Sequence, residues 1–261
     1  MEDYLSLNKQ EWNKRTLLHV DSDFYNLKGF KAGKSSLNEI ELALLGDVKD
    51  LSICHLQCHF GMDSLSLSRM GAKVVGLDLS DEAIKKATEL NDELGLSARF
   101  VCGDVYSAPE LISERFDMVF TSYGTIGWLP DLGRWASVVS NLLKPGGRLV
   151  FVEFHPFIWV YDDSLQEIRY TYFNKESIHE SEEGSYASET KEQLRSISWN
   201  HALSEVVSAL QEQGLKLDDF KEYDYSPYPI FPEQKEFESG KFRPSIWGDK
   251  LPLVYSLCMS K

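Results

Sequence analysis

The chain has 261 residues, of which 43% are apolar and 26% charged, and its formal net charge is −14. Such a chain can bury a full core, as one large domain or as one domain with a substantial insertion. The negative charge disfavours non-specific attraction to nucleic-acid phosphates and to anionic membranes. The N-terminus carries acids without an apolar core, and no apolar run has membrane-spanning length. We therefore expect a cytoplasmic protein without nucleic-acid or membrane partners.

Residues 1–50 precede the first expected strand and have a mixed character. Residues 5–12 and 37–45 show helix-like apolar spacing, and the segment 21–26 between them is polar and then aromatic. We expect a helical cap here. Its aromatic residues, Tyr25 among them, either pack in a small core of their own or cover a ligand.

The stretch from residue 51 to 80 has the outline of a nucleoside-binding unit. An apolar run at 51–56 stops at the polar turn QCHFG, 57–61, and a second apolar run at 74–77 ends at Asp78. This pattern is typical of a strand, a turn into a helix and a second parallel strand. An acid at the tip of the second strand, about 20 residues past the turn, is placed to hold a ribose diol.

The segment after Gly61 alternates like a strand, but a parallel pair of strands needs a crossover, which is usually helical. We therefore expect a helix that ends at Gly71. Asp63 either caps the start of this helix or reaches the ammonium group of a bound ligand.

The turn itself narrows the choice of nucleoside. Dinucleotide-binding folds use three glycines so that the backbone approaches a pyrophosphate closely. Here Gln57 and His59 occupy two of those places, and only Gly61 remains. S-adenosylmethionine has no phosphate, and turn amides at a helix N-terminus can hold its amino-acid end. The turn favours this cofactor over a nicotinamide dinucleotide, which stays the alternative.

The following elements continue the alternation of helix and strand. Apolar spacing predicts helices at 80–94 and 131–143, the second one stopped by the turn KPGG at 144–147. Strands are expected at 98–102, 118–122 and 148–154. The strand at 98–102 ends at Gly103-Asp104.

Together with Gly103-Asp104, FDMV at 116–119 and LLKPGG at 142–147, the block 51–80 resembles the motifs of class I S-adenosylmethionine-dependent methyltransferases. The motifs come in the expected order over about residues 50–156. Gln57, His59 and His55, which stands where an acid is common, depart from the usual pattern. The resemblance implies a Rossmann-like, doubly wound α/β sheet of about seven strands whose last strand, here 253–259, is antiparallel. It also implies S-adenosylmethionine as cofactor and S-adenosylhomocysteine as product.

The resemblance also gives roles to single residues. It implies that Asp104 binds the adenine amino group and that the amide of Val105 meets a ring nitrogen, the alternative being that Asp104 caps a turn. In similar enzymes the N-terminal segment forms part of a lid, which suits Tyr25. The expected cofactor contacts are Tyr25, Gln57, Cys58, His59, Gly61, Asp63, Asp78, Leu79, Asp104, Val105 and Thr121.

The acceptor should lie at the outer ends of the strands at 118–122 and 148–154. Tyr123 and Trp128 either line its pocket or pack the loop. Period-2 geometry predicts that Glu153 and His155 point to one side, where His155 is either a general base or a structural histidine. The Asn/Asp-Pro-Pro-Tyr motif of many amino methyltransferases is missing, which disfavours methylation of a nucleobase or glutamine amide nitrogen.

Residues 157–197 break the repeating pattern. We expect a strand at 168–173 and then, over 174–191, a polar and acidic hairpin or flap on the substrate side. A helix at 198–213, a strand at 215–225 and a long loop at 226–250 follow. The chain is thus expected to comprise a cap (1–50), a cofactor-binding core (51–156), an insertion (157–197) and the C-terminal part of the core domain (198–261).

The run CHLQCH at 54–59 contains two cysteines and two histidines, which are residue types that can bind a metal ion. Its spacing excludes haem attachment, and no second ligand pair completes a zinc site. Neighbours on a strand point to opposite faces, so Cys54 and His55 cannot converge easily. We predict no metal and read the thiols as small apolar groups in the sheet.

These features predict a methyltransferase that moves a methyl group from S-adenosylmethionine to a small-molecule acceptor by in-line displacement. Such a reaction mainly needs alignment and the exclusion of water. The acidic composition and the aromatic residues expected at the acceptor site, Tyr123 and Trp128, suit a small neutral or cationic acceptor. An NAD(P)-dependent oxidoreductase and a non-catalytic S-adenosylmethionine-binding protein are the alternatives.

Overall fold

A computed structural model describes residues 3–162, 164–231 and 233–261. Its centre is a seven-stranded sheet of order β3-β2-β1-β4-β5-β11-β8. The strands are β1 (Ser52–Leu56), β2 (Lys73–Asp78), β3 (Arg99–Cys102), β4 (Phe116–Ser122), β5 (Leu143–Phe154), β8 (Lys216–Tyr223) and β11 (Val254–Ser260). Strands β1 to β5 run parallel, whereas β11 pairs antiparallel with both β5 and β8. The predicted doubly wound sheet with an antiparallel last strand is confirmed.

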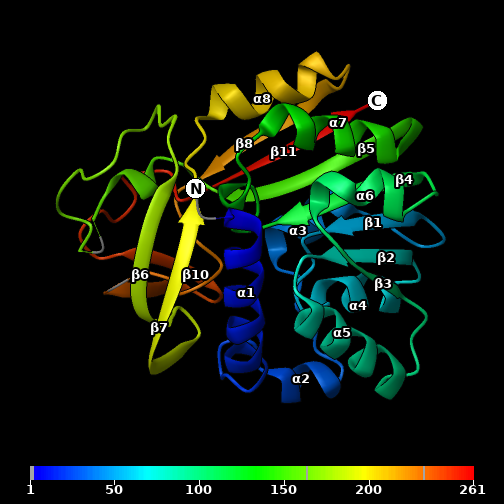
Figure 1. Cartoon of the computed structure of the whole chain (residues 1–261), viewed down its shortest axis with the longest axis horizontal. Coiled ribbons are helices and arrows are strands. Elements are labelled where there is room, and N and C mark those ends of the chain that lie inside the picture. Colours follow the sequence, from blue (N-terminus) through cyan, green and yellow to red (C-terminus); the bar gives the residue numbers. More distant parts are fainter. Residues whose placement is uncertain (1–2, 163, 232) are drawn as a thin grey trace.

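Helices cover both faces of this sheet (Figure 1). The helices are α1 (Tyr4–Val20), α2 (Leu27–Lys31), α3 (Glu39–Leu45), α4 (Met62–Arg69), α5 (Asp81–Glu93), α6 (Ala108–Leu111), α7 (Leu132–Leu142) and α8 (Leu203–Glu212). Helical turns η1 (Val105–Ser107), η2 (Ile126–Trp128) and η3 (Ile158–Val160) complete the set. No helix among the described residues is both long and apolar enough to cross a membrane.

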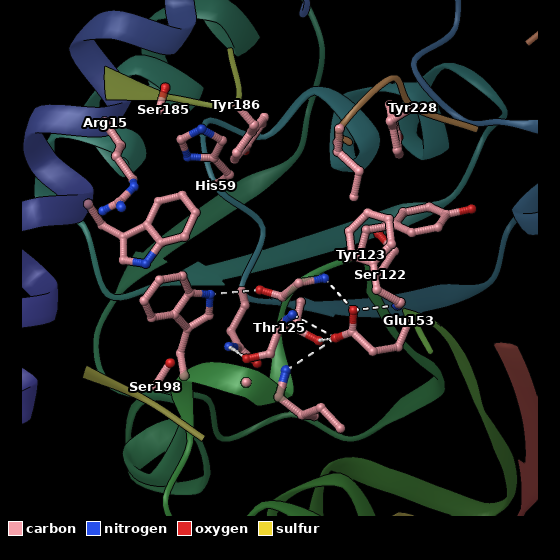
Figure 2. Close-up of a pocket in the computed structure, with 18 of the residues that line it drawn as sticks. Arg15, His59, Ser122, Tyr123, Thr125, Glu153, Ser185, Tyr186, Ser198 and Tyr228 are labelled. Carbon is pink, nitrogen blue, oxygen red and sulfur yellow. Dashed lines mark hydrogen bonds between the residues drawn. The ribbon is translucent and has the colours of Figure 1, made fainter. Parts of the chain in front are cut away.

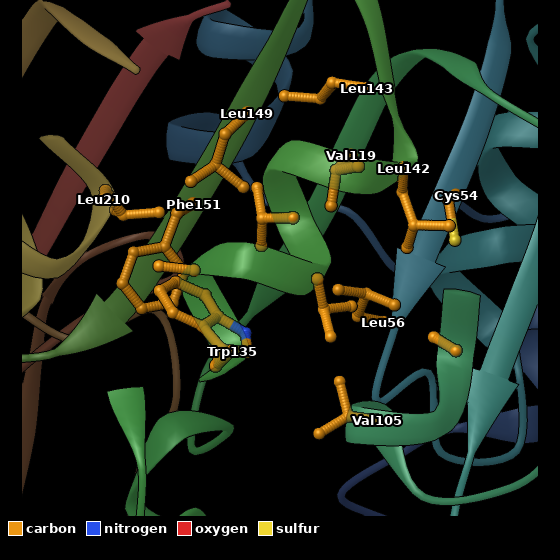
Figure 3. Packing of buried hydrophobic residues seen from close by; sticks show 14 of the residues in the cluster. Cys54, Leu56, Val105, Val119, Trp135, Leu142, Leu143, Leu149, Phe151 and Leu210 are labelled. Atoms are coloured by element: carbon orange, nitrogen blue, oxygen red, sulfur yellow. The ribbon is translucent and has the colours of Figure 1, made fainter. Parts of the chain in front are cut away.

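Each face of the sheet has its own apolar core. On one face Trp135 of α7 packs with Phe151 of β5, Leu56 of β1 and Leu210 of α8 (Figure 3). Residues of α4 and α5 form the core on the other face. Burial of this apolar surface is the main stabilising contribution to the fold. The result is a rigid platform whose parallel strands all end at one edge.

The helix starts follow from capping chemistry, with one correction. Ser80 accepts a hydrogen bond from the amide of Ala83 at 3.0 Å and so begins α5. Helix α4, however, is capped by Gly61, and Asp63 lies in its first turn. The prediction that Asp63 caps this helix is wrong, because its carboxylate instead accepts the hydroxyl of Ser36 at 2.6 Å.

Three expectations outside the cofactor-binding core also need correction. Residues 168–173 form no strand, apart from an isolated bridge between Tyr161 and Ile168. Helix α8 begins at Leu203 rather than at 198, because Ser198 ends strand β7 (Ser188–Ser198). The expected loop 226–250 contains the hairpin of β9 (Gln234–Glu238) and β10 (Lys241–Pro244).

The insertion after β5 contains the hairpin of β6 (Ile178–Ser185) and β7, which lies beside α1 (Figure 1). The side-chain amide of Asn8 donates to the carbonyl of Ile197 at 2.8 Å and accepts from its amide at 3.1 Å. Glu11 accepts from the amide of Arg195 at 2.9 Å. Side chains of α1 thus bind the edge of β7 as a neighbouring strand would, and helix and hairpin form one covering unit.

The Asn8→Ala variant is expected to loosen this unit. It leaves the amide and carbonyl of Ile197 without these partners at a buried position, which costs about 1–3 kcal/mol. Limited proteolysis should then cleave the chain between residues 178 and 198 faster than in the wild type. Asn141→Ala, a change of an exposed asparagine on α7, is the control. Equal cleavage rates in the Asn8 variant and the wild type would contradict the coupling.

Candidate active site

A cavity of about 1310 Å³ lies at the edge where the parallel strands end. Its lining includes residues at the carboxyl ends of five strands, namely Gln57, Asp78, Asp104, Ser122 and Glu153. Ligands of open α/β sheets bind at this edge. Pockets for single small ligands measure roughly 300–1,000 Å³, so this cavity has room for a cofactor together with an acceptor.

The turn after β1 keeps a glycine-like backbone despite its side chains. Gln57, His59 and Gly61 have φ angles of 55°, 51° and 79°, so all three are left-handed. For a residue with a Cβ this conformation costs roughly 1–2 kcal/mol. The side chain of Gln57 donates to the carbonyl of Thr125 at 2.7 Å. Two of the three left-handed positions in this turn thus carry a side chain.

Asp78 lies beside this turn at the end of β2. Its carboxylate accepts the amides of His59 at 2.7 Å and of Ser80 at 2.9 Å. Burial raises the pKa of Asp78 to about 6. A carboxylate offers about four acceptor sites, so two amide donors leave lone pairs for a ligand in the cavity, which Asp78 lines.

Asp104, which follows β3, caps a helical turn and also lines the cavity. It accepts from the amide of Tyr106 at 3.3 Å and so caps η1. It also lines the cavity, as do Leu79 and Val105, and burial raises its pKa.

The loop after β4 is held by the carboxylate of Glu153. This side chain accepts the amides of Gly124, Thr125 and Ile126, the last two at 2.7 and 3.3 Å (Figure 2). Trp128 donates its indole N–H to the carbonyl of Gly124 at 2.8 Å and also lines the cavity. Glu153 therefore fixes the loop that forms the cavity floor.

The structure contradicts the expectation for His155, which is not among the residues that line the cavity. Strand β5 ends at Phe154, so the period-2 rule no longer applies at residue 155. The His155 Nε2 lies 3.0 Å from a carboxylate oxygen of Glu222, and its Nδ1 accepts the amide of Phe157 at 3.1 Å. Both ring nitrogens are thus engaged by groups outside the cavity lining, which favours the structural reading of His155 over that of a general base.

Thr121 is also misplaced by the sequence argument. It is fully buried inside β4 and does not line the cavity, whereas the next residue, Ser122, does. Neighbouring residues of a strand point to opposite faces, so only one of the two reaches the cavity. The remaining expected contacts all line it: Tyr25, Gln57, Cys58, His59, Gly61, Asp63, Asp78, Leu79, Asp104, Val105, Tyr123, Trp128 and Glu153.

Residues of the cap close one side of the cavity. His19 of α1 lies with its Nδ1 3.0 Å from Nε2 of His59 and its Nε2 3.1 Å from the hydroxyl of Ser185. The hydroxyls of Tyr25 and Tyr186 are 2.6 Å apart. Burial lowers the pKa of His19 to about 3. Figure 2 shows His59, Ser185 and Tyr186 gathered together at this side.

Aromatic rings continue the cavity wall from this side, since Phe24 contacts Tyr186 with a centroid distance of 5.2 Å, and the sequence argument identified only part of this wall. The Tyr123 ring packs against Tyr228 and Phe154 with centroid distances of 5.1 and 5.4 Å. Phe24 stacks on Tyr228 at 5.5 Å, and Trp159 meets Phe154 at 5.9 Å. Of these residues only Tyr123 was singled out from the sequence, and Tyr228 lies in the segment 226–250 that was expected to be a long loop.

Carboxylates outnumber cations in this cavity. Arg15 is the one arginine or lysine among its described lining residues. The acidic lining residues are Asp23, Asp63, Asp78, Asp104, Glu153, Asp162, Glu180, Glu182 and Glu183. The site therefore disfavours an anionic ligand.

Comparisons with known proteins agree with this arrangement. Residues 53–147 match the family model described as "Methyltransferase domain". An uncharacterised protein of Haemophilus influenzae is 28% identical over 60% of this chain and 68% of its own length. A ubiquinone biosynthesis O-methyltransferase of Serratia proteamaculans is 26% identical over 51% of this chain and 56% of its own length. The chain thus aligns with little more than half of that relative.

Solved structures show the same fold. A SAM-dependent methyltransferase of Methanosarcina mazei superposes with a TM-score of 0.58 at 22% identity, covering 86% of this chain and 98% of its own. The motif order, the strand order and the domain match over the cofactor-binding core agree with one another. Residues 53–147 therefore match a methyltransferase domain, within a fold that S-adenosylmethionine-dependent methyltransferases share.

Proposed function

We propose that this protein transfers a methyl group from S-adenosylmethionine to a small-molecule acceptor inside the cavity. The observation that carries the proposal is Asp78, a carboxylate with free lone pairs at the end of β2, next to the left-handed turn 57–61. Asp78 would bind the ribose hydroxyls, and Asp104 and the amide of Val105 would bind the adenine. Amides at the start of α4 would hold the methionine end.

The acceptor would occupy the aromatic side of the cavity, near Tyr123 and Tyr228. The similarity to proteins named ubiquinone biosynthesis O-methyltransferases favours a hydroxyl acceptor. The excess of carboxylates in the lining favours a neutral or cationic molecule and argues against a nucleic acid. Acceptor and cofactor held together in one cavity would meet the need of an in-line displacement for alignment.

The Asp78→Asn variant is expected to bind S-adenosylhomocysteine at least tenfold more weakly, a loss of about 1.4 kcal/mol, because charge-assisted hydrogen bonds to the ribose become neutral. Calorimetry at pH 8, above the pKa of about 6, measures the ionised carboxylate. Asp117→Asn is the control, since Asp117 pairs with Lys144 at 2.8 Å and does not line the cavity. Unchanged affinity in the Asp78 variant would refute its role.

The same titration with NAD⁺ separates the dinucleotide alternative from the proposal. Binding of NAD⁺ in place of S-adenosylhomocysteine would favour an oxidoreductase. Transfer of a tritiated methyl group to a protein-free metabolite extract then tests for turnover. Cofactor binding without transfer to any component of the extract would favour a non-catalytic binding protein.

A further inference from the structure

Tyr123 has an unusual backbone conformation at the point where β4 enters the cavity. Its φ angle is 50°, and its amide donates to the carbonyl of Val152 at 2.8 Å. A bulky residue in this region is strained, and such strain clusters at functional sites. The conformation places the phenol ring against the cavity, where it packs on Tyr228. The left-handed conformation of Tyr123 thus destabilises the folded state, and other contacts of the fold must compensate for it.

Behind Tyr123 lies a buried carboxylate that no step described so far uses. Glu41, in the first turn of α3, is fully buried, and its Oε2 accepts the hydroxyl of Tyr123 at 2.7 Å. Its Oε1 accepts the backbone and side-chain amides of Asn38, both at 3.2 Å. Glutamine serves equally well in such a capping box. Capping alone therefore does not explain a carboxylate at this buried position.

The groups that face Glu41 come from three other segments. Asp63 of α4 adds a negative charge, Tyr123 follows β4, and the hydroxyl of Tyr228 accepts from the side chain of Asn38 at 2.8 Å. Burial, with a further contribution from Asp63, raises the pKa of Glu41 to about 7. Near neutral pH this carboxylate can therefore take up and release a proton.

We propose that Tyr123, backed by Glu41, removes the proton from the hydroxyl or amine of the methyl acceptor. This inference rests on the proposed function and deepens it, because it restricts the acceptor to molecules that lose a proton on methylation. Tyr123, which lines the cavity, is the catalytic residue. Glu41 acts through Tyr123 and is a positioning residue.

The atoms and charges of this step balance. The acceptor oxygen or nitrogen forms its bond to the methyl carbon while the bond from that carbon to sulfur breaks, and the sulfonium becomes a neutral thioether. The acceptor's proton moves to the phenol oxygen of Tyr123 as the phenol's own proton moves to Glu41. Glu41, now neutral, returns its proton to solvent after the product has left.

The test measures single-turnover methyl transfer between pH 5.5 and 9 with tritiated S-adenosylmethionine. The acceptors are catechol, phenylethylamine and a protein-free metabolite extract. In the wild type the rate should rise with pH up to about 7 and then level, because the relay needs ionised Glu41. Glu41→Gln and Tyr123→Phe should each lower the rate at pH 8 at least tenfold and abolish that rise. Affinity for S-adenosylhomocysteine should change less than twofold.

Glu39→Gln is the matched control, because it makes the same chemical change on the same helix at an exposed side chain. It should keep the wild-type rate and pH profile. If Tyr123→Phe or Glu41→Gln also keeps them, the relay is refuted while the methyltransferase proposal stands. A wild type that binds S-adenosylhomocysteine but methylates none of the three acceptor sources would refute both. A rate loss with an unchanged pH profile would show that the pair has only a structural role.

Discussion

The Gly61→Ala variant is expected to lose about 3 kcal/mol of unfolding free energy and most of its affinity for S-adenosylhomocysteine. A Cβ at this position would lie 2.8 Å from the Cβ of Ala87 and 2.8 Å from the ring of Phe100. Overpacking of this kind costs about 1–3 kcal/mol. The left-handed φ of 79° adds roughly 1–2 kcal/mol. Because relief of the clash must move the turn, cofactor binding should fall with stability.

Gly146→Ala separates the two contributions. Gly146 has a φ of 78°, almost that of Gly61, but an added Cβ would meet nothing within 4 Å. Its variant should show only the backbone cost of roughly 1–2 kcal/mol and normal affinity. Urea unfolding of both variants gives the stability difference, and calorimetry gives the affinity. Equal losses of stability and affinity in the two variants would show that the close contacts of the added Cβ with Ala87 and Phe100 contribute nothing.

The stability difference between the wild type and His55→Asn is expected to shrink by about 2 kcal/mol between pH 6.5 and pH 4.5. His55 is buried in β1, its Nδ1 is 2.8 Å from the hydroxyl of Ser64, and burial lowers its pKa to about 3. The folded state holds it neutral, whereas the unfolded chain binds a proton below about pH 6.5. Its contribution to stability is therefore complete above pH 6.5 and is lost as the pH falls.

Urea unfolding of both proteins at several pH values measures this difference, in which the other titrating groups cancel. Asparagine can still bond to Ser64 but does not titrate, so the variant should be the less stable protein at pH 8 and lose its disadvantage in acid. A difference that stays constant with pH would mean that the His55 imidazole takes up protons in the folded protein.

The sequence predicted the sheet well because, over residues 51–154, the apolar spacing of each element agrees with the turn and capping residues at its ends. Apolar runs mark the parallel strands, and Ser80 and Asp131 cap the helices expected after them. Asp78, which ends β2, was located from spacing, and Asp104, two residues after β3, from the resemblance of the motifs. Strand ends of a parallel sheet converge at one edge, so a local pattern was enough to bring Asp78 and Asp104 into one cavity.

The errors arise where side-chain direction depends on tertiary contacts. His155 follows the last residue of β5, and the chain turns there toward Phe157, so alternation no longer applied. Glu41 drew no prediction, because its partner Tyr123 is 82 residues away in sequence. Contacts between the cap, the hairpin and the loop after β8 leave no periodic trace in the sequence.

The left-handed residues of the turn after β1 have a consequence for ligand affinity. A glycine turn is mobile before its ligand arrives and loses conformational entropy on binding. Here the side-chain amide of Gln57 donates to the carbonyl of Thr125, and the imidazole of His59 contacts that of His19. These contacts order the turn during folding, so less conformational entropy remains to be lost when the nucleoside binds.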